Sequence, residues 1–213
     1  MATSKNHTQV LIGGKVFTLS GYESEEYLQR VSSYINHKMT ECASMDGYRR
    51  QTAEMRSILL ALNIADDKIV ALADGELIDV AGVSDPMFAQ KLMGDSIAFA
   101  YNEDKVILCA PANGTLSVLF PTGHAFGLQM KNGVQILVHC GVNTVETNGD
   151  GFRVLNKKQG DHVKAGEPII EVNMKKLKPK YDMSTMLIIT DAAGQTIHFK
   201  EPQSVKRGDS VIL

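Results

Sequence analysis

The chain has 213 residues, 44% of them hydrophobic, which is enough to bury a core in one domain or in two small ones. A net charge of −2, with neither half strongly charged, gives no electrostatic case for nucleic acid or anionic lipid as a partner. No apolar run approaches the roughly 18 residues that span a bilayer, and the N-terminus MATSKNHTQ lacks a signal-peptide pattern. Three scattered cysteines without CxxC spacing argue against disulfides or structural zinc. We therefore expect a cytoplasmic protein.

The first part of the chain, residues 1–72, predicts a small α+β domain, a hairpin followed by two helices. Two β-prone runs flank Gly13-Gly14, which is a hairpin signal. Ser24 then precedes two glutamates, as expected at a helix start. A second helix carries apolar residues at spacings of 3, 4, 3, 4 and 3, at Met55, Ile58, Leu62, Ala65, Ile69 and Leu72. Because so small a domain buries such a seam poorly, we expect self-association.

From residue 73 to residue 213 the pattern changes to short strands. Runs of four to eight β-prone residues alternate with Gly, Pro, Asn and Asp, and one short helix is expected near 86–93. This pattern is typical of an all-β antiparallel sandwich or barrel. We place the boundary between the two domains near Leu72.

The run VQILVHCGV ends in a histidine. Alternation along a strand places Val134, Ile136, Val138 and Cys140 on one face, and Gln135, Leu137 and His139 on the other. Cys140 and His139 therefore point to opposite sides and cannot form a nucleophile pair, so Cys140 is expected in the core.

A second histidine, His124, follows a turn in FPTGHAFGL. If the two strands pair as a hairpin through residues 130–133, equal distances from the turn make His124 and His139 neighbours. Three uses of such a pair stay open at this point: a phosphoryl acceptor with its stabiliser, two metal ligands, or incidental polar surface. A neutral imidazole is nucleophilic near pH 7, whereas a metal site usually needs a third ligand that is not evident here.

A different motif, GDHVKAGEPIIEVNMKKL, is similar to the lead-in to a biotinyl or lipoyl attachment hairpin. Its attachment lysine would be Lys175, but the flanking residues do not match. A second copy of the turn, VKRGDSVIL, favours a generic turn entering a strand.

Taken in order, GELIDV, SDPMFAQKLMGDSIAF, APANGTLSVLFPTGHAFGL, VQILVHCGVNTV and GDGF resemble the glucose-type enzyme IIA (EIIA) domain of the bacterial phosphoenolpyruvate-dependent sugar phosphotransferase system. The resemblance covers residues 73–213. It implies that His139 accepts a phosphoryl group from the phosphohistidine of HPr and passes it to a cysteine of a sugar-specific EIIB domain. It further implies that His124 stabilises the phosphoryl oxygens and that Thr122 orients His124. On this resemblance we expect no cofactor and no metal ion.

The same resemblance implies a shallow docking face around His139. Its residues by motif position are Asp85, Met87, Phe88, Leu92, Phe120, Leu137, Asn143 and Val145. Core packing remains the alternative for the apolar ones. The family usually has Asp where this chain has Asn143, so we expect altered HPr docking with the chemistry retained.

The first part of the chain also resembles a known family. VLIGGKVFTLSGYESEEYLQRVSSYINHKM and MDGYRRQTAEMRSILLALNIADD are similar to ZapA, which binds the division protein FtsZ. The resemblance implies a homodimer formed through the N-terminal domain and, as an expectation, FtsZ binding. Two functions follow: a phosphocarrier whose N-terminal half dimerises it, or a division-associated protein with a regulatory EIIA module.

Overall fold

The computed structural model describes residues 5–22 and 24–213. The first four residues, part of the segment considered above for a signal peptide, lie outside it. The chain divides into two compact units, Met1–Asp66 and Asp67–Leu213.

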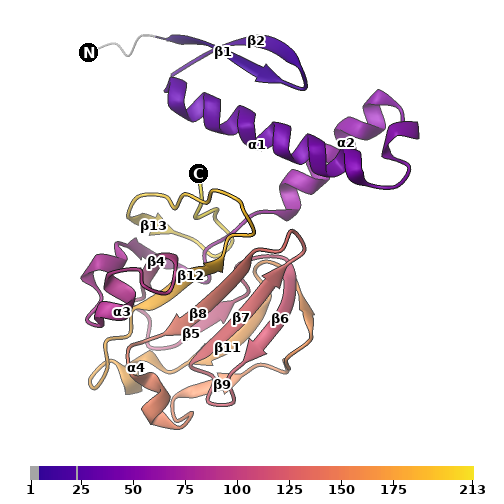
Figure 1. Cartoon of the computed structure of the whole chain (residues 1–213). Helices are drawn as coiled ribbons and strands as arrows, with labels where there is room; N and C mark the ends of the chain where they lie inside the picture. The colour runs from indigo at the N-terminus through magenta and orange to yellow at the C-terminus, as the bar shows by residue number, and fades with distance from the viewer. Residues whose placement is uncertain (1–4, 23) are drawn as a thin grey trace. The chain divides into compact units, whose positions relative to one another are not determined.

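The first unit is a β-hairpin followed by helices (Figure 1). Strands β1 (Asn6–Ile12) and β2 (Lys15–Gly21) pair antiparallel, and Gly13 and Gly14 make the turn with φ of 58° and 78°. Both angles lie in the left-handed region that glycine enters at low cost, so the predicted hairpin is confirmed together with its turn. Two helices, α1 (Glu25–Ser44) and α2 (Ala53–Asp66), follow, separated by the short η1 (Tyr48–Arg50).

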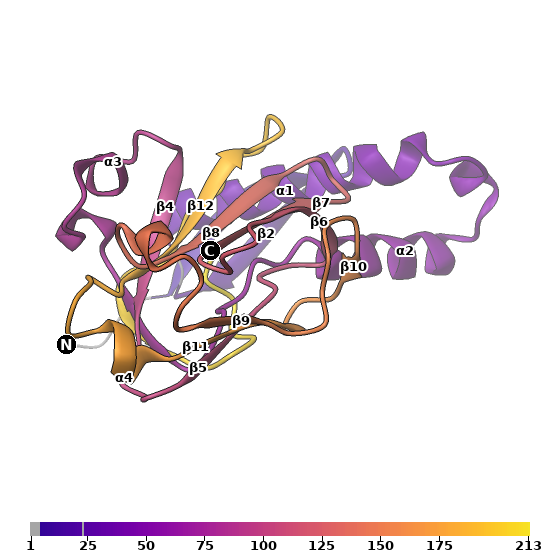
Figure 2. The same ribbon diagram turned by 90° about the horizontal axis from the view of Figure 1, so that it is seen from below.

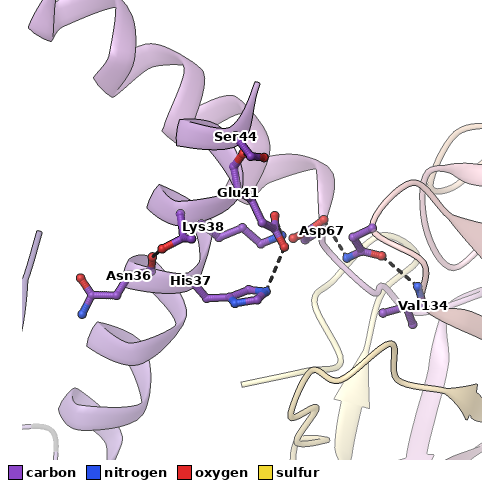
Figure 3. A network of polar contacts seen from close by, with 9 residues as sticks. Asn36, His37, Lys38, Glu41, Ser44, Asp67 and Val134 are labelled. Carbon is purple, nitrogen blue, oxygen red and sulfur yellow. Dashed lines mark hydrogen bonds and ion pairs between the residues drawn. The ribbon is translucent and has the colours of Figure 1, made fainter. Parts of the chain in front are cut away.

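Polar contacts fix the hairpin to α1. The Asn36 amide donates to the Leu11 carbonyl at 2.7 Å, and its oxygen accepts from the Gly13 backbone N–H at 2.8 Å. Ser24 caps α1 by accepting from the Tyr27 N–H, as predicted. Further along α1, the His37 Nε2 lies 3.0 Å from the Glu41 Oε1 (Figure 3).

Helix α2 ends earlier than the sequence pattern suggested. It ends at Asp66, and Ile69 and Leu72 lie in the core of the second unit. Backbone bonds hold this segment there, because Val70 N–H donates to the Pro111 carbonyl and the Leu72 carbonyl accepts from Cys109 N–H. The expected six-residue seam is therefore wrong in its last part. Met55, Ile58 and Leu62 remain on α2, and the side chain of Ala65 lies outside the described residues.

The second unit is an antiparallel two-sheet β structure. The larger sheet has the strand order β10-β6-β7-β8-β12-β4-β3-β13, and the smaller has β5-β11-β9. The strands of the larger sheet are β3 (Gly75–Ile78), β4 (Asp95–Ala100), β6 (Gly114–Leu119), β7 (Ala125–Met130), β8 (Gln135–Cys140), β10 (His162–Val163), β12 (Thr185–Asp191) and β13 (Gln203–Val205). Those of the smaller sheet are β5 (Val106–Cys109), β9 (Phe152–Val154) and β11 (Pro168–Val172). The prediction of an all-β antiparallel domain is confirmed.

The two sheets face each other in the view from below (Figure 2), and the side chains of the main core lie between them. Inward residues of β7 and β8 share it with those of β5 and β11, among them Phe126, Val138, Leu108 and Ile170. The alternation predicted for β8 is confirmed, since Ile136, Val138 and Cys140 are buried while Gln135 is exposed.

The outer face of the larger sheet has a small core of its own. The η2 turn (Val80–Gly82) with its C-cap Val83, and helix α3 (Pro86–Ala89), the short helix expected there, supply Val80, Val83 and Phe88 to it. They pack against Ala98, Val142, Met186 and Ile188, with Leu137 partly buried beside them. Two further short helices, η3 (Thr144–Thr147) and α4 (Met174–Leu177), were not predicted.

Candidate functional site

Strands β7 and β8 bring the two histidines together. Their pairing places Ala125 opposite His139. The sequence pattern predicted His124 at that position, so the predicted register is wrong by one residue. His124 lies just before β7, and its carbonyl accepts from the Cys140 N–H at 2.8 Å. The two imidazoles nevertheless meet, with ring centroids 5.1 Å apart and the planes at 75°.

His124 is held by a neighbour from its own turn. Thr122 Oγ1 lies 2.5 Å from His124 Nδ1, and the Phe120 ring packs at 5.1 Å from the imidazole. The residue is only 5% exposed, and burial lowers its pKa. With Nδ1 engaged, Nε2 is the nitrogen of His124 left for another group.

His139 is more accessible than His124, and its two ring nitrogens differ. It is half-buried on the outer face of β8, yet its Nδ1 is enclosed and has no hydrogen-bond partner at normal geometry within the described part of the chain. Burial and the nearby His124 lower its pKa to about 4, against the opposing effects of the Gly141 carbonyl and the Asp85 carboxylate. The ring is therefore neutral at pH 7, and Nε2 is the nitrogen that can meet an incoming group.

Most of the predicted docking residues lie at the surface. Met87, Leu92, Phe120 and Val145 are all more than a third exposed, and Leu137 is half-buried. Phe88 differs, because it is only 8% exposed and packs in the outer core. Phe88 is therefore a core residue, which was the alternative to docking, and its neighbour Met87 takes the outward position on the short helix.

The two polar docking residues occupy turn positions. Asp85 is half-buried and caps α3 by accepting from the Met87 N–H at 2.8 Å. Asn143 is exposed with a left-handed φ of 57°, a conformation that Asn adopts more easily than most residues. It directly precedes η3, in the loop that follows His139.

Two supports of this loop were not found from the sequence. A Cβ on Gly141, where φ is 76°, would meet Thr144 Cγ2 at 2.5 Å. Asp182 accepts from the Ser84 N–H at 3.0 Å, and its backbone carbonyl accepts from Val142 N–H at 2.8 Å, so it links the α3 segment to the loop. Gly141 could have been inferred from the sequence, because a glycine directly after a strand indicates a turn. The Asp182 contacts could not, because they join segments that are far apart in the sequence.

The carrier-lysine and metal-ligand alternatives find no support in the described residues. Lys175 lies on α4 rather than at a hairpin tip, with its Nζ 3.4 Å from Asp104. Within residues 5–22 and 24–213, no group of three or more His, Cys, Asp or Glu side chains is placed to hold a metal ion.

Comparisons with known proteins identify the families that the two parts of the chain resemble. The family model "phosphoenolpyruvate-dependent sugar phosphotransferase system, EIIA 1" matches residues 67–195, and the model "Cell division protein ZapA" matches residues 8–78. The solved glucose permease IIA from Mycoplasma capricolum has a TM-score of 0.64 and 35% identity, covering 68% of this chain and 93% of that one. The glucose-specific EIIA component of Staphylococcus epidermidis is 34% identical over 148 residues, which cover 68% of this chain and 87% of that protein.

A longer relative is the glucose-specific EIICBA component of Staphylococcus carnosus, 30% identical over 206 residues. The match covers 95% of this chain but only 29% of that protein.

The second unit thus has the fold of a phosphotransferase-system EIIA domain. The chain belongs to the EIIA 1 family of the phosphoenolpyruvate-dependent sugar phosphotransferase system, with a ZapA-type segment before it. None of the helices described here is both long and apolar enough to cross a membrane.

Proposed function

We propose that this chain is a cytoplasmic phosphocarrier that takes a phosphoryl group from phospho-HPr onto His139 and passes it to a cysteine of a sugar-specific EIIB domain. The observation that carries this proposal is the pair of imidazoles with ring centroids 5.1 Å apart, both with a lowered pKa, in which the Nδ1 of the half-buried His139 is enclosed.

The attack uses the Nε2 lone pair of His139. If the ring hydrogen lies on the enclosed Nδ1, the lone pair is on Nε2. The Nε2–P bond forms as the donor's P–N bond breaks, and the donor nitrogen keeps the electron pair. In the second half-reaction the cysteine thiolate attacks phosphorus and His139 leaves as a neutral imidazole.

His124 stabilises the phosphoryl group in this proposal. If the Thr122 hydroxyl donates to Nδ1, the ring hydrogen lies on Nε2, where it can be donated to a phosphoryl oxygen. Because transfer between nitrogens needs mainly positioning and charge stabilisation, a fixed donor of this kind suits the reaction. The exposed Met87, Leu92, Phe120 and Val145, the half-buried Leu137, and the polar Asp85 and Asn143 form the docking surface for both partners.

The test is phosphorylation by phosphoenolpyruvate, enzyme I and HPr, read by intact-protein mass. Wild type should gain one phosphoryl group and His139→Gln none. His124→Ala should accept the phosphoryl group and pass it to EIIB at least tenfold more slowly than wild type, because it loses the N–H that donates to the phosphoryl oxygens. A phosphorylated His139→Gln would refute the assignment of the acceptor.

A second function rests on the first unit, because the ZapA model matches residues 8–78. In it, the N-terminal unit forms a homodimer and binds FtsZ, and the EIIA domain is a regulatory module. Co-sedimentation with FtsZ polymers tests this function. Binding that changes when His139 is phosphorylated supports the regulatory form, and a chain that stays in the supernatant rejects it.

A further inference from the structure

Phe88 and its neighbour Met87 have opposite surroundings on the four-residue helix α3. Met87 is 48% exposed, whereas Phe88 is 8% exposed and packs among the aliphatic side chains of the outer core. Successive helical residues point about 100° apart, so one residue faces solvent and the next faces the sheet. A docking partner can therefore reach Met87 but meets almost nothing of Phe88.

What Phe88 does contact is the reactive histidine. Its ring centroid lies 5.1 Å from that of His139, with the planes at 46°. His124 lies at the same centroid distance from His139, and across the sheet the residue paired with His139 is the buried Met186. The His139 imidazole is thus bounded by an aromatic ring, a second imidazole and an apolar strand neighbour.

We propose that Phe88 is a positioning residue that acts through His139: it holds the imidazole with Nδ1 enclosed and Nε2 outward, and it keeps water from the phosphorylated ring. This inference rests on the proposed function for its second part. An aromatic ring packed against an imidazole limits the rotation of the imidazole, and only a fixed ring presents the same nitrogen to both partners.

Excluding water from phosphorylated His139 would protect the phosphoryl group from hydrolysis. Hydrolysis of phosphohistidine forms a P–O bond from water while the P–N bond breaks. The P–N electron pair returns to Nε2, so the ring becomes a neutral imidazole that keeps its Nδ1 hydrogen. The water oxygen stays on phosphorus as phosphate, which retains one of the water protons and releases the other to solvent. Each such event loses the phosphoryl group before it reaches EIIB, so a carrier needs a slow hydrolysis rate. A buried phenylalanine beside the ring removes one approach for water.

The electrostatic surroundings agree with this role. Burial is the largest cause of the lowered His139 pKa, and the His124 ring lowers it further. Asp85, at the start of α3, and the Gly141 carbonyl act in the opposite direction. Opening the Phe88 side of the ring weakens the burial effect while Asp85 remains, so the pKa should rise.

The test uses the full chain with Phe88→Ala, Phe88→Leu and Met87→Ala. NMR titration of His139 in the unphosphorylated protein should show a pKa raised by about one unit in Phe88→Ala, with a smaller rise in Phe88→Leu. The half-life of the phosphoprotein, measured after HPr and enzyme I are removed, should shorten severalfold in Phe88→Ala. Met87→Ala should leave both values at wild type and should raise only the HPr concentration needed for half-maximal rate.

The outcomes separate the two proposals. If wild type gains no phosphoryl group, the proposed function fails, and the titration still decides the ring-positioning part. If folded Phe88→Ala and Phe88→Leu keep the wild-type pKa and half-life, Phe88 is packing only and the inference is wrong. If Phe88→Ala does not fold, Phe88→Leu decides by the same two measurements. A change confined to the HPr concentration, as in Met87→Ala, would return Phe88 to the docking surface.

Discussion

Keeping the His139 imidazole neutral inside the fold gives the second unit a pH-dependent stability. The pKa of His139 is about 4 in the folded chain against an ordinary value of 6.5. Between these values the unfolded chain binds a proton that the folded chain does not, so the free energy of unfolding falls as pH falls from about 7 to about 4. The loss amounts to about 3 kcal/mol at roughly 1.36 kcal/mol per pKa unit.

The measurement is urea unfolding followed by circular dichroism at pH 7 and pH 4.5. His139→Gln, which cannot titrate, should lose less stability than wild type on acidification. His162→Gln is a suitable control, because that histidine is exposed. Equal losses in wild type and His139→Gln would contradict the assigned cause.

A second prediction at the residue scale concerns Asn143. This neutral, exposed residue stands where the family usually has a carboxylate, and its left-handed φ of 57° also suits aspartate. Asn143→Asp should therefore fold normally and raise the second-order rate of phosphorylation by HPr severalfold, an effect that weakens with salt. Stopped-flow mixing with phospho-HPr at two ionic strengths measures this rate. An unchanged rate would show that position 143 does not contact HPr.

At the scale of elements, the tip of the β7–β8 hairpin is fastened by one side chain. The Asn132 amide donates to Asp67 Oδ1 at 2.9 Å, and its oxygen accepts from the Val134 N–H at 3.2 Å (Figure 3). Asn132→Ala should lower the free energy of unfolding by about 1–2 kcal/mol, because the Asp67 carboxylate and the Val134 N–H each lose a hydrogen bond. Lys131→Ala, at an exposed position of the same turn, is the control. A loss no larger than in that control would mean that water replaces both bonds.

The same hairpin shows what the sequence could and could not predict. Alternation along β8 correctly placed His139 and Cys140 on opposite faces, because a strand has only two faces. The register was one residue out, because the pairing is centred on Asn132 and the tight Met130–Val134 turn uses Gly133 at a φ of 92°. Turn geometry of this kind depends on backbone angles that composition does not determine.

Helices shorter than two turns were the other weak point. The four residues of α4 carry no periodic pattern, and its Asn173 cap is visible only once the chain is folded. Phe88 and Met87 are adjacent and both apolar, so only packing against β12 and η2 shows which is buried. The candidate histidines, by contrast, were found from sequence because each stands where strand and turn signals are strong.

For the whole molecule, the remaining question is what covers the exposed apolar residues of α2. Met55, Ile58 and Leu62 recur at helical spacing on one face, and all three are exposed in the single chain. In the proposed homodimer a second copy covers them. The double variant Ile58→Glu, Leu62→Glu places charges on that face, so sedimentation at micromolar concentration should show a monomer where wild type is a dimer.

Ser57→Glu adds a charge one position away, about 100° around α2, and should leave the dimer intact. The double variant should accept the phosphoryl group on His139 at the wild-type rate, because the histidines and their docking residues all belong to the second unit. A dimer that survives the two glutamates would place the interface on another surface, such as the exposed strand β2. A monomer that is no longer phosphorylated would mean that the second unit needs its partner copy, which the two-unit division of the chain does not predict.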